Sequence, residues 1–263
     1  MIYLDHAATT PLAPEAWEAM RPWLEPGGIH ANPASDHALG RQASAAVEAA
    51  RAQVAALIGA RADEIIFTSG ATEANNLAIK GAVDFHAAAE RGAHVVSTRI
   101  EHKAVLDPVR WLATRGTRLT LIEPDRQGRI NAADVIAALR PETVLVSVMW
   151  VNNETGVINP IAEIAVACAE RGVLLHVDAA QAAGRLRMNL AELPISLLSL
   201  SAHKLYGPKG IGALFVRRRP RARVSPQLHG GGHEQGMRSG TLPTHQIAGF
   251  GAAAALAASR IEA

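Results

Sequence analysis

The sequence is poor in cysteine and aromatic residues and has no long apolar run. Its one cysteine, Cys168, excludes an internal disulfide framework and any metal site that needs several thiolates of this chain. No run approaches the roughly 18 apolar residues of a membrane span, and residues 1–14 lack the basic and apolar regions of a secretory signal. These absences predict a cytoplasmic protein with no membrane association and no metal site.

Positive charge is concentrated in one short segment. The formal net charge is only +2, and residues 217–223 hold five arginines. Such a segment could contact phosphate backbones, but aromatic residues make up 4% of the chain and leave few rings to stack on bases. We therefore interpret the segment as a solvated turn beside a strand, and we expect no nucleic-acid partner.

Segments with helical periodicity alternate with short apolar runs along most of the chain. Helices are predicted over residues 36–59, 72–91, 102–115, 132–139 and 161–171, and strands over 64–69, 94–99, 118–123, 143–151 and 173–179. Two further predicted strands, 195–201 and 210–216, are joined by a short glycine-containing connection that favours an antiparallel pair. The pattern predicts an α/β fold with a mainly parallel sheet covered by helices on both faces.

Five polar clusters directly follow predicted strands. Ligands of open parallel sheets bind at the carboxyl ends of the strands, so these clusters are candidates for one shared site. They are residues 69–73, 101–103, 152–154, 178–181 and 201–204.

Lys204 and Asp178 are the most informative members of these clusters. A partly desolvated lysine at a strand end can have a lowered pKa and act as the nucleophile that binds an aldehyde. A carboxylate in the same crevice could pair with a pyridinium nitrogen, and pyridoxal phosphate (PLP) needs both groups. Considered singly, Lys204 could be a surface or capping lysine, and Asp178 a helix cap or magnesium ligand.

The other clusters supply weaker signals. The glycine turn at residues 69–73 opens a helix whose free N–H groups favour an anion, with Thr72 adding a hydroxyl, although the pattern is also that of a plain helix cap. His102 could stack on a ring and move protons, or simply cap a helix. Gln181 and Asn153 could bind ring oxygens, or serve only as polar loop and turn residues.

Two patterns are rejected as functional motifs. Residues 207–212 resemble a phosphate loop but lead into a strand instead of a helix. His229, His233 and Glu234 resemble metal ligands, but the three glycines between the histidines deny them helical spacing.

Taken together, the motifs resemble cysteine desulfurases of the NifS/IscS type, which belong to the class V aminotransferase group of fold type I PLP enzymes. The resemblance covers essentially the whole sequence. Its most specific parts are residues 3–11, 32–35, 67–76, 101–105, 151–156, 176–181, 201–213 and 229–241.

The resemblance implies a three-layer α/β/α PLP-binding domain and a role for each site residue. Lys204 would hold PLP covalently, Asp178 would pair with the pyridinium nitrogen, Gln181 with the ring hydroxyl, and His102 would lie over the ring. The implied phosphate ligands are Ala71, Thr72, Ser201 and His203, while Asn153 matches a cofactor-contacting position. Thr241 matches a threonine that reaches the phosphate of the neighbouring subunit, which implies a homodimer.

The implied reaction converts L-cysteine to L-alanine, with Lys204 and His102 moving protons. Sulfur would pass as an enzyme-bound persulfide to a sulfur-acceptor or iron–sulfur scaffold protein. Cys168 matches no catalytic position, and its register in the helix predicted over 161–171 makes it a core residue. The nucleophilic cysteine and the substrate-binding arginine of the family are expected beyond residue 263.

We therefore expect residues 1–15 to be an N-terminal arm, part of the small domain in the family, and residues 16–263 to be the large PLP-binding domain. The sequence ends in a predicted alanine-rich helix around residues 252–258 without a helix-stop signal, so we expect it to be incomplete, to lack the small domain with the cysteine loop, and to be inactive in full turnover. The alternatives are a related lyase or aminotransferase, such as selenocysteine lyase, and a catalytically silent PLP-binding or scaffold protein.

Overall fold

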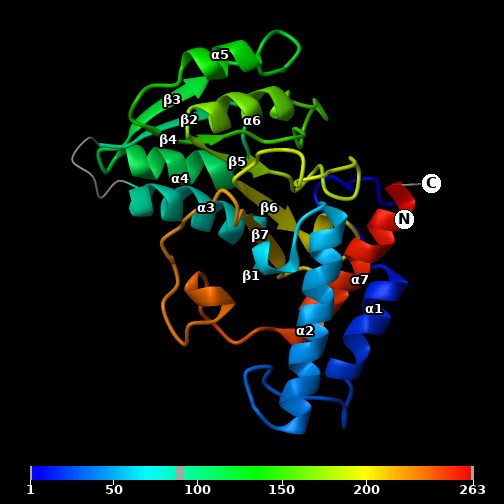
Figure 1. The fold of residues 1–263 in the computed structure, drawn as a ribbon. Helices are drawn as coiled ribbons and strands as arrows, with labels where there is room; N and C mark the ends of the chain where they lie inside the picture. Colours follow the sequence, from blue (N-terminus) through cyan, green and yellow to red (C-terminus); the bar gives the residue numbers. More distant parts are fainter. Residues whose placement is uncertain (1, 87–91, 262–263) are drawn as a thin grey trace.

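A seven-stranded sheet lies at the centre of the computed structural model, which describes residues 2–86 and 92–261 (Figure 1). The strand order is β1-β7-β6-β5-β4-β2-β3. The strands are β1 (Ile65–Thr68), β2 (His94–Thr98), β3 (Arg118–Ile122), β4 (Thr143–Ser147), β5 (Leu174–Asp178), β6 (Leu197–Ser201) and β7 (Gly212–Val216).

Only β7 runs against the other strands. Strands β2 to β6 pair in parallel, whereas β7 is antiparallel to both of its neighbours, β6 and β1. The predicted antiparallel pair is therefore confirmed, but β7 lies between β6 and the edge strand β1. Because β1 runs in the same direction as β2 to β6, the carboxyl ends of six strands lie along one edge of the sheet.

Helices cover both faces of the sheet, as expected for an α/β fold (Figure 1). They are α1 (Pro14–Met20), α2 (Ala38–Leu57), α3 (Ala71–His86), α4 (Lys103–Ala113), α5 (Ala132–Ala137), α6 (Ile161–Glu170) and α7 (Thr244–Ile261). Helices α3 and α4 contribute to one buried apolar cluster, and α1, α2, α5, α6 and α7 contribute to the other.

Successive strand residues divide between these two clusters. Leu197 of β6 and Leu214 of β7 belong to the cluster under α3 and α4, while the next residues, Leu198 and Phe215, belong to the opposite cluster. Side chains of a strand alternate between the faces of a sheet, so a fully apolar run requires cover on both sides. The three-layer α/β/α prediction is confirmed.

The predicted elements match the observed ones apart from their ends. The helix predicted over 72–91 is described as far as His86, and residues 87–91 lie outside the described residues. The strand predicted over 143–151 ends at Ser147, because the Met149 N–H donates to the Glu101 carboxylate (2.8 Å) instead of extending the ladder with β2.

Helices α1 and α7 differ most from the sequence-based expectations. Helix α1 was not predicted, and α7 begins at Thr244, well before the alanine-rich segment. Helix α7 packs against α1 and α2, and a Cβ on Gly251 would lie 2.6 Å from the Cα of Ala50. Only glycine permits this close approach. The expected division at residues 15 and 16 stays a prediction, and residues 262 and 263 lie outside the described part of the chain.

The arginine-rich segment follows β7 as a turn, as predicted, but it is not wholly solvated. The Arg217 guanidinium donates hydrogen bonds to the carbonyls of Leu190, Leu193 and Ile195. Arg218 donates to the Asp63 carbonyl at 3.1 Å. These two arginines therefore join the turn to neighbouring loops. Among residues 2–86 and 92–261, no helix has the length and apolar character to cross a membrane.

Candidate active site

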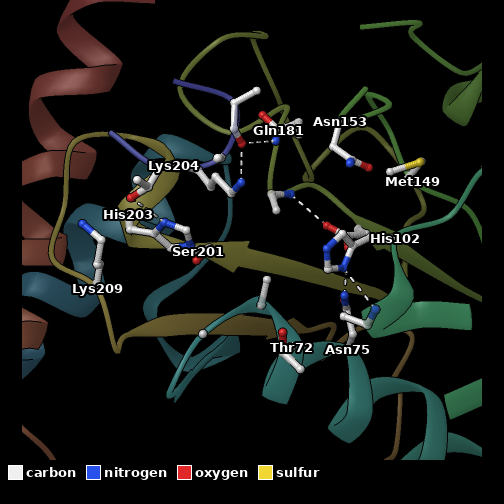
Figure 2. Close-up of a pocket in the computed structure, with 18 of the residues that line it drawn as sticks. Thr72, Asn75, His102, Met149, Asn153, Gln181, Ser201, His203, Lys204 and Lys209 are labelled. Carbon is white, nitrogen blue, oxygen red and sulfur yellow. Dashed lines mark hydrogen bonds between the residues drawn. The ribbon is translucent and has the colours of Figure 1, made fainter. Parts of the chain in front are cut away.

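A cavity of about 1080 Å³ opens at the carboxyl ends of the parallel strands (Figure 2). In this view Lys204 and His203 lie on one side of the cavity and His102 on the other. Nine of the ten predicted site residues line it: Ala71, Thr72, His102, Asn153, Asp178, Gln181, Ser201, His203 and Lys204. The tenth, Thr241, is exposed and does not line the cavity.

Lys204 ends a short helical turn, Ala202–Lys204, that directly follows β6. Its ammonium group donates a hydrogen bond to the carbonyl of Ala7 in the N-terminal arm. Burial lowers the pKa of Lys204, and the nearby positive charge of Arg185 lowers it further. A lowered pKa increases the fraction of neutral amine, the form that attacks an aldehyde carbon.

Asp178 is the last residue of β5 and is buried. Its Oδ1 accepts the Ala180 N–H (3.0 Å) and its Oδ2 accepts the Asn75 side-chain N–H (2.8 Å). Burial raises its pKa, against the opposing effect of these bonds and of the nearby Lys204 charge. A buried carboxylate held in this way gains most from a cationic partner in the cavity. Sequence reasoning assigned no role to Asn75, although the residue lies within the motif at residues 67–76.

His102 both caps α4 and lines the cavity. Its Nδ1 accepts the Ala104 N–H at 3.0 Å, so the capping alternative is correct. In the neutral ring this bond places the proton on Nε2. The cap also fixes the ring orientation, which leaves a proton carrier at the cavity wall.

The first turn of α3 forms another part of the wall. Helix α3 begins at Ala71, immediately after Gly70, and the first N–H groups of a helix have no partners within it. Glu73 reaches back to accept the Ser69 N–H at 2.7 Å, which binds its carboxylate to the backbone just before the helix. The free N–H groups of this turn and the Thr72 hydroxyl suit an anion.

The N-terminal arm closes one side of the cavity, which sequence reasoning did not anticipate. Gln181 Nε2 donates to the Ala7 carbonyl at 2.8 Å, so its expected donor atom is already engaged. The Thr10 hydroxyl donates to the His203 carbonyl (3.0 Å), and the Thr9 hydroxyl lies 3.1 Å from His203 Nδ1. The motif at residues 3–11 was the available signal, but it carried no role by itself.

Two adjacent asparagines after β4 have different roles. Asn152 stabilises the turn, because its Oδ1 accepts the N–H groups of Glu154 (3.0 Å) and Thr155 (2.9 Å). Asn153 lines the cavity, and its Nδ2 donates to the Glu154 carboxylate at 2.8 Å.

Glu101 is a buried carboxyl group behind the cavity wall that sequence reasoning left without a role. Its Oε1 accepts the Thr98 hydroxyl (2.7 Å) and the Met149 N–H (2.8 Å), which ties the ends of β2 and β4 together. Burial raises the pKa of Glu101 to about 8, and the charge of Asp178 contributes in the same direction. Glu101 therefore takes a proton near neutral pH.

Cys168 and Glu234 lie outside the cavity, whereas part of the glycine segment 207–212 lines it. Cys168 is buried among apolar side chains of α6, and burial raises its pKa to about 12, so the core prediction is confirmed. Glu234 forms a buried ion pair with Arg51 (2.8 Å). In the glycine segment 207–212, Lys209 and Gly210 line the cavity, a contribution that the sequence-based rejection missed.

The cavity has the donor set that PLP requires. It contains a lysine with a lowered pKa, a buried carboxylate to which no cationic side chain of the described residues is bonded, and a helix N-terminus suited to a phosphate group. These three features lie around one cavity and come from β6, β5 and α3.

Comparison with known proteins agrees with this donor set. The profile of the aminotransferase class-V family matches residues 2–263. The chain belongs to this family. The class-V chain is 52% identical over 262 residues to a protein named cysteine desulfurase IscS from Klebsiella pneumoniae (strain 342), and the match covers 99% of the chain and 64% of that relative. The chain thus spans somewhat less than two thirds of this relative's length.

Solved structures resemble the class-V chain closely. A structure titled SspA in complex with cysteine has a TM-score of 0.91 and 42% identity, covering 97% of this chain and 72% of that one. A structure titled NifS-like protein has a TM-score of 0.94 and 33% identity, covering 99% of this chain and 70% of that one.

Proposed function

We propose that the protein is a PLP-dependent cysteine desulfurase and that these 263 residues supply its cofactor site. The observation that carries the proposal is the convergence of Lys204, Asp178 and the first turn of α3 on one cavity. The similarity to a protein named cysteine desulfurase and to a structure containing cysteine supports L-cysteine as the substrate. Bound PLP would supply an electron sink beside the substrate α-carbon.

Each wall residue has a proposed task. Lys204 would hold the aldehyde carbon of PLP, and its free amine would move protons near the substrate. Asp178 would accept the ring N–H, and His102 would hold a proton at Nε2 on the opposite wall. The Ala71 and Thr72 N–H groups, together with Ser201 and His203, would bind the phosphate group. Gln181 would contact the ring hydroxyl in place of its bond to the Ala7 carbonyl, and Asn153 would contact a ring substituent.

Sulfur acceptance requires a thiol from elsewhere. Cys168 is the one cysteine in the sequence, lies in the core and does not line the cavity. We therefore propose that the acceptor thiol is not among these residues, and that a persulfide formed on it passes sulfur to an acceptor or iron–sulfur scaffold protein. We further propose that the protein is cytoplasmic and forms a homodimer in which Thr241, which is exposed in the single chain, reaches the partner's phosphate site.

Borohydride reduction tests the cofactor assignment. We expect the chain incubated with PLP and reduced to gain one pyridoxyl group, which peptide mass spectrometry places on Lys204. Lys204→Ala should lose this label completely, because the amine that bonds the aldehyde is gone. Lys80→Ala, at a lysine that does not line this cavity, should keep it. An unlabelled wild-type chain, or a label retained by Lys204→Ala, would overturn the proposal.

The 263-residue chain loaded with PLP is expected to give no catalytic release of alanine from cysteine. The physical reason is that its only thiol is buried and has a pKa raised by burial to about 12, so it supplies almost no thiolate. Alanine release measured with and without an added dithiol checks this. Repeated turnover without a thiol, or a persulfide detected on Cys168, would refute the expectation.

A further inference from the structure

Glu73 introduces an electrostatic problem into the first turn of α3. Glu73 lines the cavity at the place where the proposed function, on which this inference rests, puts the phosphate group. A helix N-terminus attracts anions, but a carboxylate in that turn repels a second anion at close range, and the repulsion is strong where water is largely excluded.

Arg238 supplies the opposing charge. Its Nε donates to Glu73 Oε1 at 2.7 Å and its terminal nitrogen donates to Oε2 at 3.2 Å, a two-point pair between side chains that are 17% and 19% exposed. Burial acts to raise the pKa of Glu73, but the hydrogen bonds from Arg238 and Ser69 outweigh it and hold the pKa below its usual value. Glu73 is therefore ionised, and Arg238 is the group that neutralises it.

The segment that carries Arg238 is anchored independently of the cavity. Residues 229–240 contain Glu234, whose carboxylate is bound at both oxygens by Arg51 (2.8 Å each). The same carboxylate accepts the N–H of Phe67 in β1, the strand that precedes α3. Arg218 adds a second anchor through Gln235. The pair between Arg238 and Glu73 thus joins a fixed segment to the turn that begins α3.

We propose that Arg238 is a positioning residue for the phosphate group: by pairing with Glu73 it makes the first turn of α3 accept a phosphate monoester. The pair also holds Glu73 against the Ser69 N–H, which shapes the turn that presents the remaining N–H groups. Arg238 itself does not line the cavity. Arg238 affects ligand binding through Glu73. This effect is specific for ligands that carry a phosphate group.

The test compares PLP with pyridoxal, which has the same aldehyde but no phosphate. Each compound is titrated against the chain, and occupancy is measured by borohydride reduction and mass spectrometry. In Arg238→Met, we expect the affinity for PLP to fall at least about tenfold, while that for pyridoxal stays within about twofold of wild type. Combining it with Glu73→Gln should restore most of the PLP affinity, because the unpaired carboxylate is removed.

The control variant is Arg218→Met, which removes an anchor of the same segment without touching Glu73. It should change the affinities for PLP and pyridoxal equally or not at all. An equal loss for both compounds in Arg238→Met, an unchanged PLP affinity, or no restoration by Glu73→Gln would overturn the proposal. A wild-type chain that does not bind PLP would refute the proposed function, whereas a wild-type chain that binds PLP, with the same PLP affinity in Arg238→Met, would refute this inference alone.

Discussion

Asp178→Asn is expected to weaken PLP binding by about 2–5 kcal/mol, because an amide cannot carry the negative charge that pairs with the ring nitrogen. The substitution preserves the shape of the side chain. Its oxygen can still accept the bond from Asn75 or from Ala180, so the loss should reflect charge more than packing. Titration of the chain with PLP, followed by the visible absorbance of the bound cofactor, measures the change.

The same substitution is expected to stabilise the cofactor-free chain at neutral pH. Burial raises the pKa of Asp178 in the folded state. Such a carboxyl group favours folding below its unfolded pKa, and that contribution is lost as the pH rises through the folded pKa. The amide removes this loss, so urea unfolding at neutral pH should show a more stable variant.

A matched control is available for both measurements. Asp134→Asn changes an exposed carboxylate on α5 and should alter neither PLP affinity nor stability appreciably. Opposite signs for binding and stability in Asp178→Asn are the signature of a buried charge kept for its ligand. Unchanged PLP affinity in this variant would remove Asp178 from the proposed site.

Glu101→Gln is expected to raise the free energy of unfolding of the cofactor-free chain by an amount that grows with pH. Folding raises the pKa of Glu101 from 4.5 to about 8 by burial. Stability that is present below about pH 4.5 is therefore lost progressively as the pH rises toward 8. At pH 7 this loss amounts to about 3 kcal/mol, since one pKa unit corresponds to about 1.4 kcal/mol.

Glutamine should mimic the protonated acid closely. Its side-chain oxygen can accept the bonds from the Thr98 hydroxyl and the Met149 N–H that Glu101 Oε1 accepts. Urea unfolding at several values between about pH 5 and pH 8 should give a difference from wild type that is small at the acid end and largest at the alkaline end. Glu163→Gln, at an exposed position of α6, is the control. A difference that does not depend on pH would contradict a protonated Glu101.

Much of the site was predictable because short segments of the sequence identify its residues. An apolar strand followed at once by a polar residue indicates a side chain at the carboxyl edge of a parallel sheet, and Asp178, Lys204 and His102 were all identified in this way. Gln181 lines the cavity as predicted, yet its amide donates to the arm. The orientation of this amide depends on Ala7, which is 174 positions away, and no local sequence pattern predicts that contact.

The residues that sequence reasoning missed act through distant partners. Asn75 bonds Asp178 across 103 positions of sequence, and Arg238 pairs with Glu73 across 165. Arg238 lies in a glycine-rich segment without helical or strand periodicity, so its partner could not be inferred. Glu101 was visible in the sequence as a member of a polar cluster, but its burial and its raised pKa follow only from the packing of β2 against β4.

The sequence by itself determined the alternation of helices and strands, the cover on both faces of the sheet and the edge at which chemistry occurs. These features follow from apolar periodicity and from the residue that follows each strand, which are properties of short segments. Only the tertiary structure decided that β7 lies between β6 and β1, that the N-terminal arm contacts Lys204, and that Arg238 meets Glu73. Such contacts join segments far apart in the chain, and their partners are selected by packing and charge in three dimensions.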